Sequence, residues 1–264
     1  MNRFPLNYVN GFVPDQIVGL DGVGEGTLTV KGPLKKLDIN GEVYLDSSYL
    51  VSVPYGIKMR FADDPVQIRN SNIQFENFEL FASNGSPLDI SGYLDFSDLD
   101  KMKLDAQMRA KDFQIIDAKK NPRSEVYGKA FVDFSGRING LLSNLQLTGK
   151  LDVLGSTDVT YVVRDGTLTT DDELKDLVQF TNFNDSTIDV IKRPDIMGFT
   201  MALSVDIDEQ AHVFCALNAD QSNYVDFVGG GNLLLNYDPT NGVQVRGRYT
   251  LSDGKMKYSL PVIP

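Results

Sequence analysis

The sequence predicts an all-β protein built from a long, mostly antiparallel sheet. Apolar and polar residues alternate along most of the 264-residue chain, as they do in strands with one buried and one exposed face. Turn-forming sequences separate many of these runs, as at 84–87, 238–242 and 252–254. Such short turns join antiparallel neighbours, because parallel neighbours need a long crossover. A strand motif with glycine at its centre also recurs along the chain.

The alternating runs predict individual strands. The clearest are 102–110 and 199–208, where every second residue is apolar over the whole run. Shorter runs follow the same pattern at 28–30, 51–53, 73–75, 132–138, 159–163, 211–219 and 233–237. Together these runs predict strands from near the N-terminus to near the C-terminus.

One short helix is expected near 171–180. Thr170-Asp171-Asp172-Glu173 has the form of a capping box, in which the Thr hydroxyl and the Glu carboxylate satisfy the first backbone N–H groups. Leu174, Leu177 and Val178 then fall on one helical face. The segment 182–194 has little alternation and is predicted to be a mobile loop.

Composition and charge exclude several classes of protein. The longest uncharged stretch, 138–149, is 12 residues, shorter than the roughly 18 to 20 that cross a bilayer as a helix. A net charge of −11 argues against nucleic-acid binding, which depends on cationic contacts to phosphate. One His, one Cys and no Trp leave no His/Cys metal cluster and no disulfide within the chain. No cofactor is predicted.

The candidate catalytic residues are equally few. His212 and Cys215 are three residues apart, so on a strand they point to opposite faces, and Cys215 is expected to be a buried structural thiol. The glycine runs 22–26 and 229–231 lack the spacing of phosphate-binding loops, and both lead into strands. The nucleophile motif G-x-S-x-G is absent. We therefore predict that the chain is not an enzyme.

The central observation is an internal repeat of the form apolar-x-apolar-x-Gly-x-apolar-x-apolar. Its four copies are centred on Gly41, Gly92, Gly149 and Gly247. The first and third copies align without a gap at an offset of 108 residues, which places Ser48 opposite Ser156. We therefore expect a single repetitive β domain over 1–264, with units around 22–61, 62–110, 126–165 and 195–258.

Each of these glycines shares its face with the apolar residues of its copy. A mid-strand glycine costs about 0.5 to 1 kcal/mol relative to Ala, so four at one place indicate a structural role. Strands that bend sharply at the glycine would make the apolar face concave, and their stacking would give an apolar trough. Alternatively, the glycines mark corners of a closed sandwich or barrel filled by its own side chains. Periodicity alone favours the closed form.

Three stretches near the C-terminus resemble a known family. They are Phe227 to Tyr237 with its three glycines, the sequence G-R-Y-T-L-S-D-G at 247–254, and Tyr258 to Pro264. Together with the repeats and the expected helix, they resemble the C-terminal region of the TamB family, which is AsmA-like, in its Bacteroidetes-type form. The 247–254 stretch is the most specific part of this resemblance.

The resemblance implies a curved sheet folded into a taco-like trough with an apolar groove. It also implies a periplasmic segment of an inner-membrane-anchored protein, a TamA/BamA-type outer-membrane barrel partner, and roles in phospholipid transport and barrel-protein assembly. The chain would then be a fragment, and 256–260 an unprotected edge strand. The apolar repeat residues would face acyl chains: Leu37, Ile39, Val43, Leu45, Leu88, Ile90, Leu94, Phe96, Leu145, Leu147, Leu151, Val153, Val245, Tyr249 and Leu251.

Two other functions remain open from the sequence. One is a closed β-sandwich that acts as an adhesin or carbohydrate-binding module, and the other is a β-rich glycosidase. The sandwich predicts a compact particle with no continuous opening, whereas the glycosidase requires two carboxylates across a cleft.

Overall fold

The computed structural model describes residues 2–12, 19–33, 36, 38–45, 47–52, 57–120, 126–163 and 198–259. These residues form one sheet of 17 strands together with two short 3-10 helices, η1 (Leu6–Phe12) and η3 (Leu99–Lys101). The strands are β1 Asn2–Pro5, β2 Gly19–Asp21, β3 Val23–Lys31, β4 Asp38–Tyr44, β5 Tyr49–Ser52, β6 Ile57–Phe61, β7 Val66–Arg69, β8 Asn72–Phe81, β9 Pro87–Asp95, β10 Lys103–Ala118, β11 Val126–Leu141, β12 Asn144–Val153, β13 Asp158–Val162, β14 Phe199–Ile207, β15 His212–Ala216, β16 Tyr224–Asp238 and β17 Gly242–Lys257. The all-β prediction is confirmed. The helix expected near 171–180 and the loop 182–194 lie outside the described residues.

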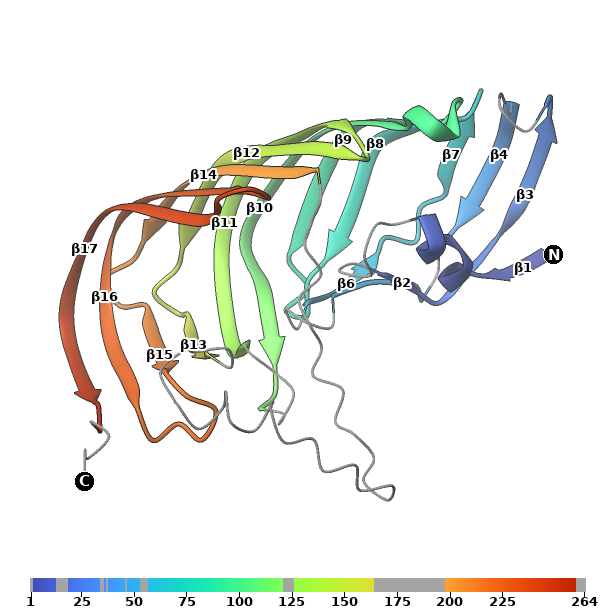
Figure 1. The fold of residues 1–264 in the computed structure, drawn as a ribbon. Helices are drawn as coiled ribbons and strands as arrows, with labels where there is room; N and C mark the ends of the chain where they lie inside the picture. Colours follow the sequence, from blue (N-terminus) through green and yellow to red (C-terminus); the bar gives the residue numbers. More distant parts are fainter. Residues whose placement is uncertain are drawn as a thin grey trace, which may run out of the picture.

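Strand pairing follows the chain from one end of the sheet to the other. Strands β8 to β11 pair antiparallel with their sequence neighbours. Beyond β11, two shorter strands lie end to end opposite each long one: β12 and β13 both pair with β11, and β14 and β15 both pair with β16. Strand β17 pairs with β16 and lies at one end of the sheet, whereas β1, β3 and β4 lie at the other (Figure 1).

The expectation of a mostly antiparallel sheet is confirmed, with two exceptions. The pairs β12–β14 and β13–β15 are parallel. Parallel neighbours need a long connection, and residues 164–197, which lie outside the described part, supply the chain length between β13 and β14.

The end-to-end strands are separated by tight turns that lie side by side across the sheet. In the turn between β12 and β13, Thr157 N–H donates to Leu154 O (3.0 Å), and between β14 and β15, Ala211 N–H donates to Asp208 O (3.0 Å). The turns contact each other, because His212 N–H donates to Thr157 O (2.9 Å). Figure 1 shows the long strands β16 and β17 bending part-way along their length.

One predicted turn is instead a strand irregularity. The residues 252–254 were expected to separate two strands, but β17 runs unbroken through them and the register against β16 shifts between Val228 and Gly229. A bulge lets a strand bend without ending. The separate edge strand expected at 256–260 is therefore the end of β17, as far as Lys257.

In the first and third repeats, the glycine-centred strand is followed by the same kind of turn. Ser48 N–H donates to Leu45 O (3.0 Å) between β4 and β5, as Thr157 does to Leu154 between β12 and β13. Both hydroxyls are buried and donate to a neighbouring strand: Ser48 Oγ to Val23 O and Thr157 Oγ1 to Phe131 O, each at 3.2 Å. The counterpart of Ser48 is therefore Thr157, and the exposed Ser156 lies one residue away.

The main core lies where β6 meets strands β8 to β11. Its buried members are Phe61, Leu80, Ala82, Leu88, Phe113 and Val132. Twelve half-buried apolar side chains pack against it, which gives this end of the molecule its interior.

Candidate functional site

One face of the sheet carries continuous cross-strand rows of apolar residues and glycine. Three rows run through the same seven strands, β9, β10, β11, β12, β14, β16 and β17. The rows are Gly92-Ala106-Ile138-Leu147-Met201-Tyr237-Val243, Ile90-Met108-Gly136-Gly149-Leu203-Leu235-Val245 and Leu88-Ala110-Phe134-Leu151-Val205-Leu233-Gly247. We call this surface the apolar face.

The opposite face is polar along the same strands. A typical row is Asp89-Arg109-Ser135-Lys150-Ser204-Leu234-Arg246, in which Leu234 is the apolar exception. Ion pairs cross this face, because Lys150 Nζ lies 2.8 Å from both Asp152 Oδ1 and Asp206 Oδ2. The charges therefore collect on the polar face, which keeps the sheet hydrated while the other side stays apolar.

A recess of about 560 Å³ occupies the apolar face at the C-terminal end of the sheet. Eight apolar side chains line it: Ile207, Val213, Val225, Phe227, Leu233, Val245, Tyr249 and Leu251. Ile207 precedes the turn between β14 and β15 and Val213 follows it, yet both line the same space. The apolar face is therefore on the inside of the bend at this place. The volume falls within the range of about 300–1,000 Å³ for small-molecule sites.

The tyrosine in this recess presents its ring and not its hydroxyl. Tyr249 Oη donates to Gly229 O (2.7 Å), so its polar tip is satisfied by the wall. Its ring meets Phe227 edge-on, with 5.7 Å between ring centres, a favourable aromatic arrangement. Burial raises the pKa of the Tyr249 phenol. The recess thus offers an apolar lining with no exposed hydrogen-bonding group from this residue.

The repeat glycines allow neighbouring strands to approach closely. A Cβ on Gly149 would lie 2.6 Å from Ser135 O, and the matching carbonyls for the other three are Thr27 O for Gly41, Asp105 O for Gly92 and Asn232 O for Gly247. In each case the oxygen belongs to the residue before the glycine's cross-strand partner. Pairing passes through Gly41, Gly149 and Gly247 without a register shift, whereas beside Gly92 the register against β8 shifts between Phe75 and Phe78. Their role in bending the strand stays a prediction.

The structure brings most of the predicted lining residues onto the apolar face. Leu88, Ile90, Leu147, Leu151 and Val245 belong to the three rows. Leu94 and Leu145 lie in a fourth row, and Val153 and Tyr249 lie in a fifth. Leu251 lines the recess. Their surroundings differ along the sheet. Those near the main core, such as Leu88, are buried in it, whereas Val245 and Leu251 are 56% and 61% exposed.

Four predicted lining residues lie apart from these rows, and a fifth has no described position. Ile39 and Val43 are on β4, where Val43 is buried opposite Val66. Leu45 packs against the main core, and Phe96 directly follows β9. Leu37 lies outside the described residues.

Sequence reasoning missed five members of the recess: Ile207, Val213, Val225, Phe227 and Leu233. Ile207, Val213 and Leu233 lie in the alternating runs 199–208, 211–219 and 233–237, so the signal for these three was present. Val225 and Phe227 lie outside those runs. The repeat motif covers only its glycine-centred segments, and none of the five residues lies in one of them.

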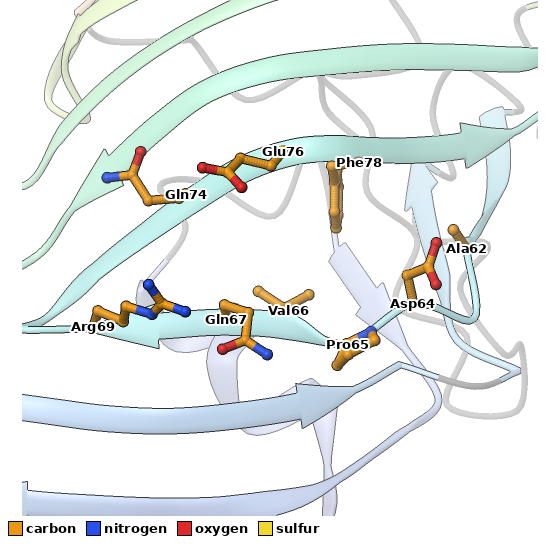
Figure 2. Close-up of a pocket in the computed structure, with 9 residues that line it drawn as sticks. All are labelled: Ala62, Asp64, Pro65, Val66, Gln67, Arg69, Gln74, Glu76 and Phe78. Carbon is orange, nitrogen blue, oxygen red and sulfur yellow. The ribbon is translucent and has the colours of Figure 1, made fainter.

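A second, smaller pocket of about 160 Å³ lies between β7 and β8. Strand β8 pairs with β7 near Ile73 and with β6 near Leu80, and the pocket fills the gap between these contacts. Figure 2 shows charged and amide side chains around it and Phe78 directed into it. Its volume is below the usual range for a ligand site, so the C-terminal recess is the better candidate.

The lone His and Cys do not form a catalytic pair. His212 hydrogen-bonds Asp158 and Asp226, whereas Cys215 follows Val213 on the other face of β15. Cys215 is half-buried and not fully buried as expected, and partial burial raises the pKa of its thiol. Among the described residues, no cluster of His, Cys, Asp and Glu is arranged to hold a metal ion. No described helix is long and apolar enough to span a bilayer.

Comparison with known protein families matches residues 76–260 to the family described as the TamB C-terminal domain. No curated protein and no solved structure matches the chain. The matched region begins in β8 and includes every strand of the three apolar rows and the whole recess. Proteins of this family are non-enzymatic transport and assembly proteins, which confirms the prediction that the chain is not an enzyme. The match covers more than half of the 264 residues, so the chain belongs to the TamB family.

Proposed function

We propose that this chain is a periplasmic segment that holds phospholipid acyl chains along its apolar face and passes them toward the outer membrane. Membership of the TamB family implies a role in outer-membrane biogenesis. The observation that carries the finer proposal is the set of apolar rows that cross seven strands and reach the C-terminal recess. In this proposal the apolar face forms the inside of a continuous trough, as in the taco-like shape.

The energetics of such a surface suit transport. Burying a methylene group is worth about 0.8 kcal/mol, so a chain of many methylenes is held firmly without any polar contact. The apolar rows follow one another at the spacing of alternate residues, so the apolar surface continues from one row to the next. An acyl chain can therefore move along the face while it stays out of water.

The partner in this proposal is an outer-membrane barrel of the TamA/BamA type, and the client cargo includes barrel proteins as well as lipid. The support is the edge of β17, which pairs with β16 on one side and has no strand on its other side among the described residues. Exposed strand edges recruit further strands. Met256 on this strand is 68% exposed, which adds an apolar contact.

Family proteins are periplasmic and anchored in the inner membrane, so we place this segment in the periplasm of a Gram-negative cell. Its assignment to the Bacteroidetes-type form stays a prediction.

The experiment is lipid copurification from a Gram-negative host, with extracted phospholipid measured by mass spectrometry. Leu147→Asp puts a carboxylate into an apolar row, whereas Thr148→Asp, the next residue of β12, puts it on the exposed polar face. We expect bound phospholipid to fall at least severalfold in the first variant and to be unchanged in the second. Absence of phospholipid from the unaltered protein, under conditions that retain it on a known lipid carrier, contradicts the proposal.

A further inference from the structure

The single histidine of the chain is held between two carboxylates on the polar face. His212 Nδ1 lies 2.8 Å from Asp158 Oδ1, and its Nε2 lies 2.7 Å from Asp226 Oδ1. The three residues come from β13, β15 and β16, which are hydrogen-bonded neighbours and lie side by side in Figure 1. One imidazole ring therefore ties three strands together.

Donation to both carboxylates at once requires the protonated ring. A neutral imidazole has one N–H donor and one lone pair, so it can donate to only one of the two carboxylates. The imidazolium donates to both. The hydrogen bond to Asp226 raises the pKa of His212 most, partial burial opposes it, and the hydrogen bond to Asp158 adds to the rise.

Charged residues on the neighbouring strands β11 and β17 surround the His212 group. Lys129 on β11 lies directly opposite Asp158, and Lys255 on β17 lies directly opposite Asp226. Asp253, also on β17, lies opposite Val228, which is the direct partner of His212 on β16. Protonated His212 thus sits between acidic neighbours, with lysines one strand further out on both sides.

The same strands form the wall of the recess. Val213 follows His212 in β15, and Val225 and Phe227 flank Asp226 in β16. These three side chains line the recess on the opposite face of the sheet. Because alternate residues of a strand point to opposite faces, the position of His212 and Asp226 fixes how the two strands present their apolar side chains.

We infer that protonated His212 clamps the wall of the recess, so that the recess holds an acyl chain more tightly at acidic than at alkaline pH. The inference rests on the proposed lipid-holding function and adds its regulation. Because the folded state binds the proton more strongly, the clamp is complete below the ordinary His pKa of about 6.5 and is lost as pH rises through the raised value. The His212 side chain is 34% exposed, so water screens the effect and keeps it modest.

The test is binding of a phosphatidylcholine with a fluorescent acyl chain, whose headgroup carries no proton that changes between about pH 5.5 and 8.5. We expect the dissociation constant to rise about threefold over this range, a modest change that reflects a partly exposed ion triad. Its midpoint should coincide with the imidazole titration by NMR, which is unambiguous because the chain has one His. His212→Gln should bind with no such pH dependence. Asp226→Asn should lower both midpoints together, which a purely structural role would not produce.

Three outcomes distinguish failure of the pH regulation from failure of the proposed lipid-holding function. Binding of the fluorescent phosphatidylcholine that is equally tight across the pH range overturns the inference and leaves lipid holding intact. Midpoints of binding and imidazole titration that differ also overturn it. No binding at any pH overturns both the regulation and the lipid-holding proposal. If His212→Gln fails to fold, the comparison of the two midpoints in the unaltered protein and in Asp226→Asn still decides the question.

Discussion

The carbonyl oxygen of Ser135 lies where Gly149 has no side chain, 2.6 Å from the position that a Cβ would take. Gly149 also faces another glycine, Gly136, directly across the strand pair, and a Cβ would meet its Cα at 2.7 Å. Both atoms belong to backbone and cannot rotate away. Close approach of the neighbouring strand is thus the structural demand that glycine meets at position 149.

The first prediction follows from this contact. Gly149→Ala should lower the free energy of unfolding by about 2 kcal/mol, in the range of overpacked sites. The measurement is the urea midpoint followed by circular dichroism. Gly254→Ala is the matched control on β17, where the nearest atom to a new Cβ is Asp226 O at 3.2 Å and the backbone needs little movement. Equal losses in the two variants would show that glycine is needed at these positions for some reason other than the Ser135 contact.

The second prediction concerns the turn between β12 and β13. Thr157 Oγ1 accepts from Phe131 N–H (3.1 Å) and donates to Phe131 O (3.2 Å), and the residue is 3% exposed. Thr157→Val keeps the shape but leaves the partly buried Phe131 N–H without its acceptor, so the free energy of unfolding should fall by about 1–3 kcal/mol.

The neighbouring exposed Ser156 supplies the control for that prediction. Ser156→Ala should change the free energy of unfolding by less than about 0.5 kcal/mol, as most exposed substitutions do. If both substitutions were neutral, the hydroxyl of Thr157 would not hold the turn to β11, and the likeness to Ser48 would have no energetic meaning.

The sequence predicted the strands and their faces well and the bends poorly. Alternation is a local property, so the run around Leu147 could be assigned to the apolar side without knowledge of its neighbours. Alternation does not assign faces across a turn, because the residues from Asp208 to Ala211 are not in an extended strand. The sequence therefore did not place Ile207 and Val213 in the same recess. Nor does alternation say which side of a bend is concave, since that depends on how the turns of β12 to β15 align across strands.

The hydrogen bonds of His212 to two carboxylates could not be predicted from the sequence either. His212 lies 54 residues from Asp158 and 14 from Asp226, and only the parallel pairing of β13 with β15 brings all three together. That pairing contradicts the expectation from short turns, which is correct for the antiparallel neighbours. Long-range parallel contacts leave no local signal in a single sequence.

The third prediction concerns acid stability. Asp105 on β10 receives two hydrogen bonds from Arg137 on β11, Nε to Oδ1 at 2.9 Å and Nη2 to Oδ2 at 2.7 Å. The hydrogen bond from Arg137 holds the pKa of the Asp105 carboxyl below its usual value. Because the folded carboxylate binds protons more weakly than the unfolded one, its stabilising effect is present at neutral pH and disappears as pH falls below about 4.

Asp105→Asn tests that account through the pH dependence of the urea midpoint. Relative to the unaltered protein, the variant should be less stable at neutral pH and closer to it at about pH 3, where Asp105 is protonated in both states. Asp89→Asn is the control, since this exposed carboxylate lies on the polar face of β9 outside the Asp105–Arg137 contact, and its substitution should change the free energy of unfolding by less than about 0.5 kcal/mol. A difference between Asp105→Asn and the unaltered protein that persists at low pH would assign the effect to packing and not to charge.

The fourth prediction separates residues that stabilise the sheet from residues that offer a surface to lipid. Leu203 and Val245 lie in the same apolar row, joined through Leu235, but Leu203 is 7% exposed and Val245 is 56% exposed. Leu203→Ala should cost about 3 kcal/mol of stability because it leaves a cavity among packed neighbours. Val245→Ala should cost less than about 1 kcal/mol, since most of this side chain is not covered by the protein.

Lipid binding should show the reverse order. The exposed Val245 side chain is available to an acyl chain in the recess, so its truncation removes contacts with the ligand, and the dissociation constant for a fluorescent phosphatidylcholine should rise about fourfold, the equivalent of one buried methylene. Leu203→Ala, measured under conditions where it stays folded, should bind nearly as well as the unaltered protein, because its side chain is already covered. Should the two variants lose binding in proportion to their loss of stability, the exposed apolar residues at the C-terminal end would be packing surface for further protein and not a surface for lipid.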